Sequence, residues 1–101
     1  MDIVEELIVE KDRYKHIAKH GVKVSEAREV TEGDYVYIKG REGKWLLIGK
    51  TKEGRYLTIV VGPREKKGVY GLVTARPASK EERSFYSEFI LQKGDEQSGK
   101  N

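Results

Sequence analysis

The stretch RYLTIVVGPREKKGVYGLVTARP, residues 55–77, decides the fold, because it holds the two most β-prone runs of the chain. Residues 55–61 and residues 69–75 alternate apolar with mixed side chains, and a polar loop containing Pro63 separates them. A loop this short joins antiparallel strands, since a parallel pair needs a crossover of about a dozen residues or more. The stretch therefore predicts two neighbouring antiparallel strands.

Two earlier runs extend this pair into a sheet. Residues 34–39 alternate tyrosine with valine and isoleucine, and residues 44–51 hold a second apolar run. Charged turns that contain glycine, at residues 41–43 and 52–54, link the runs. Four strands joined by short loops predict an antiparallel meander.

Helical patterns precede the predicted sheet. Asp12 can cap a helix that runs to about His20, where Gly21 supplies the left-handed residue that ends it. A second short helix is predicted to begin at Ser25 and to end at Gly33.

The two ends of the chain complete the predicted fold. Residues 3–9 fit either a short strand or a helix, and we favour the strand. Ser79 and Glu82 have the spacing of a capping box, which predicts a C-terminal helix. The fold class is α+β: two N-terminal helices, a four-stranded antiparallel meander sheet and a C-terminal helix form a single domain of residues 1–91. Residues 92–101, rich in Gly, Ser and charged side chains, are predicted to be a disordered tail.

Composition excludes several classes of protein. The chain has 101 residues, of which 37% are hydrophobic and 37% charged, and this fits one small domain. Without cysteine there is no disulfide, zinc–thiolate site or Cys nucleophile, and no apolar run approaches the ~20 residues of a membrane span. The acidic N-terminus does not resemble a secretory signal, so we expect a cytoplasmic protein. The 13 Lys and 13 Glu against two Gln and one Asn are typical of a thermophile.

Charge is concentrated in the middle of the chain. Residues 34–77 carry a net charge of +6, whereas residues 1–33 carry −2 and residues 78–101 carry −1. This distribution indicates a polyanion or an acidic protein as the partner of the middle segment, and a solvated basic surface explains it equally well.

Strand alternation predicts which side chains share a face. Tyr70, Leu72, Thr74 and Arg76 fall on one side of their strand, and Tyr56 and Thr58 fall on the mixed side of the neighbouring strand. Tyrosines beside cations on a sheet are typical of a platform for single-stranded nucleic acid. The alternative is that these tyrosines are half-buried packing residues.

The remaining chemistry points to RNA cleavage without a metal. His16 and His20, at i and i+4, could share a metal, but no acidic third ligand lies one turn away, and His20 can instead serve the end of its helix. The sequence has no nucleotide-binding glycine loop and no Ser/His/acid order, so we expect neither a metal nor a small-molecule cofactor. RNA cleavage needs a base, an acid and cations for the phosphate. The candidates are Lys19, His20, Arg64, Glu65, Arg76 and Arg83.

Three groups of residues resemble the BrnT toxin family. They are HIAKHGV at 16–22 with SEA at 25–27, LIG at 47–49 with GRYLTIVV at 54–61, and VTARPAS at 73–79 with Glu82, Arg83 and Tyr86. The resemblance implies a RelE-like fold and a type II toxin that cleaves RNA without metal and is neutralised by a cognate antitoxin. It implies catalytic roles for Arg76, Lys19, Arg64 and Glu65. Tyr70 is a further candidate proton donor, and Tyr56, Lys50 and Arg83 are candidates for RNA contact.

The sequence also departs from that family. Many members carry an arginine early in the last strand, where this chain has Gly71. Loss of a cation there favours an alternative function, a non-catalytic relative that binds RNA or protein. A third interpretation is a regulator that acts through an antitoxin-like partner alone. Arg76 has an alternative as well, because it could pair with Glu81 or Glu82 and simply fix the C-terminal helix.

Overall fold

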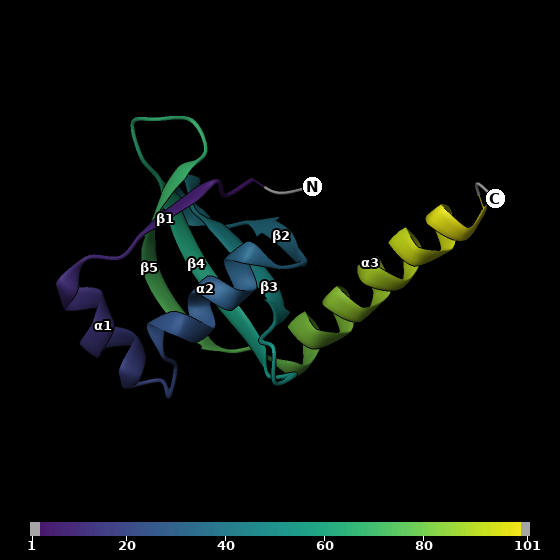
Figure 1. Ribbon diagram of the computed structural model, residues 1–101, viewed down its shortest axis with the longest axis horizontal. Coiled ribbons are helices and arrows are strands. Elements are labelled where there is room, and N and C mark those ends of the chain that lie inside the picture. The colour runs from purple at the N-terminus through teal and green to yellow at the C-terminus, as the bar shows by residue number, and fades with distance from the viewer. Residues whose placement is uncertain (1–2, 100–101) are drawn as a thin grey trace.

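The computed structural model describes residues 3–99, except for the side chains of residues 91–99 (Figure 1). The elements in chain order are β1 (Glu6–Ile8), α1 (Lys11–Ala18), α2 (Val24–Glu32), β2 (Tyr35–Lys39), a 3-10 turn η1 (Arg41–Gly43), β3 (Trp45–Lys50), β4 (Tyr56–Pro63), β5 (Val69–Pro77) and α3 (Lys80–Gly99). The prediction of an α+β fold is confirmed.

The strands form a five-stranded mixed sheet in the order β1-β5-β4-β3-β2. The β2–β3, β3–β4 and β4–β5 pairs are antiparallel, as the meander predicts. The prediction of four strands is wrong, because β1 adds a fifth, parallel to β5, with Leu7 opposite Tyr70. Residues 3–9 do contain a strand, but its partner lies about sixty residues away along the chain, and local periodicity cannot reveal that pairing.

A β-bulge in β5 decides which side chains share a face. Val60 lies opposite Thr74, whereas the next residue, Val61, lies opposite Leu72, so Val73 is an extra residue. Simple alternation across residues 70–76 is therefore wrong. Tyr70 and Leu72 face the main core with Ala75, and Thr74 and Arg76 lie on the opposite face.

Helices lie on both faces of the sheet and beside one edge. The main core lies between the sheet and the N-terminal helices, and its largest buried side chains include Ile17, Leu47, Leu57 and Ile59. In Figure 1, α2 lies across the sheet, α1 lies beside β5, and α3 projects away from the body. A smaller cluster around Ile48 and Tyr86 anchors the beginning of α3 to the other face. The rest of that face, which we call the open face, carries the half-buried Val60 and Thr74.

Local signals fix several helix ends. Gly21 has φ +75°, as the predicted left-handed stop requires. The prediction that Asp12 caps the first helix is wrong: Glu10 stands at the N-cap position, without a side-chain capping bond, and Asp12 lies in the first turn. The predicted capping box of α3 is present: the Ser79 amide donates to Glu82 at 2.8 Å, and the Glu82 amide donates to Ser79 Oγ at 3.1 Å.

The predicted boundary between the domain and its tail, at residues 91 and 92, falls within α3. Its backbone continues as helix to Gly99, past residue 92, where the sequence predicts a disordered tail. The side chains beyond Ile90 lie outside the described residues, so the boundary stays a prediction. None of the helices in the described part of the chain combines the length and hydrophobicity of a membrane span.

Candidate functional site

A four-residue cluster joins β4, β5 and α3 at one end of the open face. The β4–β5 register places Thr58 opposite Arg76, and Glu82 of α3 lies over both. Arg76 donates from Nη1 and Nη2 to the two Glu82 oxygens, each at 2.8 Å. Glu82 Oε1 also accepts from the Thr58 hydroxyl and from the Ser79 amide, each at 2.8 Å. This is the pairing that the structural alternative for Arg76 predicts.

The cluster is ionised at neutral pH. Hydrogen bonding to Arg76 lowers the pKa of Glu82 to about 2, and the Ser79 amide and Thr58 hydroxyl contribute, against the opposing effect of burial. The same bond raises the pKa of Arg76. Glu82 is consequently a poor proton acceptor near pH 7. Arg76 keeps 38% of its side chain exposed, so the pair holds a cation at the surface of the sheet.

Next to this cluster, α1 places a histidine on β5. His16 Nε2 lies 3.0 Å from the hydroxyl of Thr74, which shares the open face with Arg76 two residues further along. One helical turn on, the ring of His20 lies edge-on to that of His16, with 5.5 Å between centroids. Arg13, one turn earlier, donates from Nη1 to the Val73 carbonyl at the bulge, at 2.9 Å.

A further arginine lies at the other end of β5. Arg64 donates to Glu10 at 3.0 Å. Its guanidinium lies so close above Gly71 that a Cβ at that position would collide with it. Arg64, Arg13, His16 and Arg76 thus follow β5 from Gly71 to its end, over roughly 16 Å at ~3.3 Å per residue. We call these four side chains the β5 basic strip.

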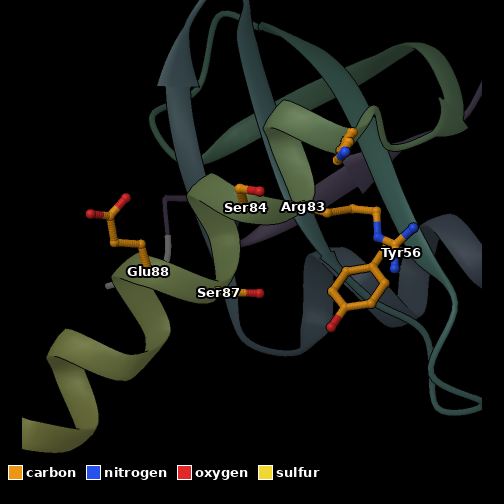
Figure 2. A pocket seen from close by; sticks show the side chains of 6 residues that line it. Tyr56, Arg83, Ser84, Ser87 and Glu88 are labelled. Atoms are coloured by element: carbon orange, nitrogen blue, oxygen red, sulfur yellow. The ribbon is translucent and has the colours of Figure 1, made fainter.

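A separate pocket of about 750 Å³ opens where β4 meets α3. Its lining residues are Tyr56, Lys80, Arg83, Ser84, Ser87 and Glu88. Figure 2 shows Arg83 reaching from α3 to the Tyr56 ring, while Glu88 points away from it. The Arg83 guanidinium lies 4.8 Å from the ring centroid, and Lys50 Nζ lies 5.7 Å from it. These are cation–π distances.

The structure brings some predicted site residues together and separates others. Tyr56, Lys50 and Arg83 lie together as one group. The candidate catalytic residues do not. Arg76 lies at one end of β5, Arg64 and the exposed Glu65 lie in or beside the β4–β5 loop at the other, and Lys19 is exposed at the end of α1. Tyr70 faces the main core, opposite to Arg76, because of the bulge.

Sequence reasoning missed two members of the β5 basic strip. The sequence suggests His16 only as a metal ligand, and it does not single out Arg13. No group of three or more His, Asp or Glu side chains in the described residues could hold a metal. The i, i+4 spacing of His16 and His20 was a usable signal for a shared helix face, but their approach to Thr74 depends on how α1 docks against β5.

Comparison with known proteins identifies the class. Residues 10–82 match the family model of the ribonuclease toxin BrnT of type II toxin–antitoxin systems. Because this match spans well over half of the chain, the protein belongs to the BrnT family of ribonuclease toxins. The match ends at Glu82, so most of α3, including the pocket residues Arg83, Ser84, Ser87 and Glu88, lies outside it.

A solved structure shows the same fold. The crystal structure of the ribonuclease toxin BrnT of Brucella abortus superposes with a TM-score of 0.60 and 15% sequence identity, covering 74% of this chain and 97% of that one. At this identity the likeness establishes the fold alone. No curated protein matches the chain significantly.

Proposed function

We propose that this chain is a metal-independent endoribonuclease toxin that cleaves single-stranded RNA along β5 and is neutralised by a cognate antitoxin. Kinship with RelE-like toxins and a cytoplasmic location are part of the proposal. The observation that carries it is the β5 basic strip, in a chain that belongs to a family of ribonuclease toxins. Basic side chains in a row match the regularly spaced charges of an RNA backbone.

Arg76 can bind a phosphate with the N–H donors that its ion pair with Glu82 does not use. A guanidinium carries five N–H donors. The described contacts of Arg76 use three: two to Glu82 and a long one, 3.4 Å, to the Pro77 carbonyl. The side chain is held in one position and remains partly exposed. We assign it to the charge that builds on the phosphate, and the family resemblance implies the same role for Lys19.

Arg64 supports the same proposal at the other end of the strand. The family resemblance places an arginine where this chain has Gly71, and the Arg64 guanidinium lies over Gly71 from the position directly after β4. A cation therefore occupies that place although position 71 has no side chain. Glu65, the next residue, is exposed and can reach solvent-side RNA groups.

The Tyr56 group supports contact with the bases. Tyr56, Lys50 and Arg83 combine an aromatic ring with two cations, and such groups bind single-stranded nucleic acid by stacking and charge. Arg83 now covers part of the ring, so a base stacks on the guanidinium plane or displaces it.

A non-catalytic relative that binds RNA or protein is the second candidate function. The observation that favours it is the bidentate pairing of Arg76 with Glu82, which compensates the positive charge that we assign to phosphate binding. Such a protein would bind RNA with an affinity that falls with the logarithm of salt concentration, and it would leave the RNA intact.

Cleavage of a defined RNA by the purified protein, with EDTA present, distinguishes the two. We expect products with 2′,3′-cyclic phosphate and 5′-hydroxyl ends, and a loss of at least ~10²-fold in rate for Arg76→Ala. Intact RNA with salt-dependent binding would favour the second candidate. Growth arrest on expression, relieved by a protein encoded beside the toxin, tests the antitoxin. A melting temperature below ~60 °C would count against the thermophile prediction.

A further inference from the structure

The proposed cleavage needs two groups that move protons, and the candidates named from the sequence do not supply them. Tyr70 lies on the face opposite to Arg76. Glu65 lies in the loop at the far end of β5. Glu82 is closest to Arg76, but its pKa of about 2 and its hydrogen bonds to three groups leave it unable to accept a proton at neutral pH.

His16 and His20 are candidates for the two proton-transfer groups, because they lie beside β5 near Thr74. His16 is half-buried and touches Thr74, between the arginine at the bulge and Arg76. Its Nε2 bond to Thr74 fixes the ring and leaves Nδ1 for another partner. His20 lies beside it, with ring planes at 74° and centroids 5.5 Å apart.

From this arrangement we propose that His16 and His20 are the proton-transfer pair of the ribonuclease and that Thr74 positions His16. The proposal rests on the proposed RNA cleavage. A neutral imidazole is the base and a protonated imidazole is the acid, and histidine is the side chain that supplies both forms near neutral pH.

The reaction balances without any further reactant. One imidazole takes the proton of the ribose 2′-hydroxyl, and the 2′-oxygen forms a bond to phosphorus. The bond from phosphorus to the 5′-oxygen breaks, and the other imidazolium gives its proton to that oxygen. The products are a 2′,3′-cyclic phosphate and a 5′-hydroxyl. One histidine has gained a proton and the other has lost one.

The first test compares five single variants on the same RNA with EDTA present. We expect His16→Ala and His20→Ala each to lower kcat by about 10²–10⁴-fold. Lys15→Ala, which removes an exposed charge from the same helix, is the matched control and should retain the wild-type rate. Thr74→Val should lower kcat about tenfold with little change in KM, and Thr74→Ser should restore it.

A modified substrate identifies proton donation directly. When sulfur replaces the 5′-bridging oxygen, the leaving thiolate needs no proton, so loss of the general acid costs little. We expect one of the two histidine variants to recover near wild-type cleavage of this substrate and the other to stay slow. Two variants that are equally slow on both substrates would overturn the assignment of an acid and a base.

Folding and binding controls keep the outcomes separate. Each variant should keep its melting temperature and its affinity for a non-cleavable 2′-O-methyl RNA. If wild type cleaves RNA and both histidine variants cleave it equally fast, this inference fails and the proposed function stands. If wild type leaves RNA intact under all conditions, both fail. If EDTA abolishes the activity, cleavage depends on a metal ion, and the assignment of the two histidines as the proton-transfer pair fails.

Discussion

At one end of β5, Arg76 donates two bonds of 2.8 Å to Glu82, a carboxylate whose side chain is 15% exposed and which accepts two further bonds. At the other end, Arg64 donates one bond of 3.0 Å to Glu10, whose side chain is 62% exposed. The two arginines are nearly equally exposed, at 38% and 39%. The pairs therefore differ in the carboxylate and not in the cation.

Because of this difference, the Arg76–Glu82 pair is structural, whereas the Arg64–Glu10 pair can exchange its carboxylate for another anion. Breaking the Glu82 contacts would leave a nearly buried carboxylate and its donors without partners, which costs more than a surface pair contributes. Glu10 can turn into water at little cost, because exposed ion pairs contribute about 0–1 kcal/mol. Arg64 is consequently free to exchange Glu10 for a phosphate, whereas Arg76 stays in place and can accept a phosphate only beside Glu82.

Replacing each carboxylate gives the largest expected effect. Glu82→Ala leaves the Thr58 hydroxyl, the Ser79 amide and Arg76 without their acceptor, and we expect the free energy of unfolding to fall by about 2–3 kcal/mol. Glu10→Ala should lower it by less than about 0.5 kcal/mol. Urea unfolding of both variants measures the contrast. Equal losses of unfolding free energy in Glu82→Ala and Glu10→Ala would show that the Glu82 pair is no more structural than the Glu10 pair.

The pH dependence of stability follows from the same contrast. In the folded protein the pKa of Glu82 is about 2, below its ordinary value of 4.5. A lowered folded-state pKa stabilises the protein above the ordinary value, and the stabilisation is lost as pH falls from about 4.5 toward 2. Between pH 6 and pH 3, wild type should therefore lose more stability than Glu82→Gln. Parallel curves for the two proteins would contradict the prediction.

Thr58 tests the structural pair with a smaller change. Its side chain is fully buried, and its hydroxyl donates to Glu82 at 2.8 Å. Thr58→Val keeps the shape but removes the donor, so we expect a loss of about 1 kcal/mol in the free energy of unfolding. Thr58→Ser keeps the hydroxyl and is the matched control for the hydrogen bond. A thermal melt that ranks valine above wild type would argue against the bond.

Local signals predicted the parts of the fold that depend on neighbouring residues. The Ser79–Glu82 capping box and the left-handed Gly21 are present as predicted. The antiparallel pairs also follow from loop length. The parallel β1–β5 pair does not, because nothing near residues 6–8 specifies a partner at residues 69–71.

The bulge explains why the site was harder to predict than the fold. The extra residue Val73 shifts the alternation of β5 by one position, so the side chains before it point to the face opposite to the one that simple alternation predicts. Tyr70 therefore faces the main core, whereas Arg76 lies on the open face. No composition signal marks Val73. The proposed role of His16 depends in turn on the docking of α1 beside that bulge, where Arg13 donates to the Val73 carbonyl.

Gly71→Ala tests the end of β5 where Arg64 pairs with Glu10, and its expected effect on stability is the smallest. The new methyl group would displace the Arg64 guanidinium, a flexible and exposed group, so stability should change by less than about 0.5 kcal/mol. Affinity for 2′-O-methyl RNA should fall a few-fold, with a salt dependence weakened by about one phosphate contact. Arg64→Ala should give the same loss, and the double variant should lose nothing more, because both changes remove one interaction. Lys66→Ala, in the same loop, is the charge control. Additive losses would mean that Gly71→Ala weakens binding by a route other than displacement of the Arg64 guanidinium.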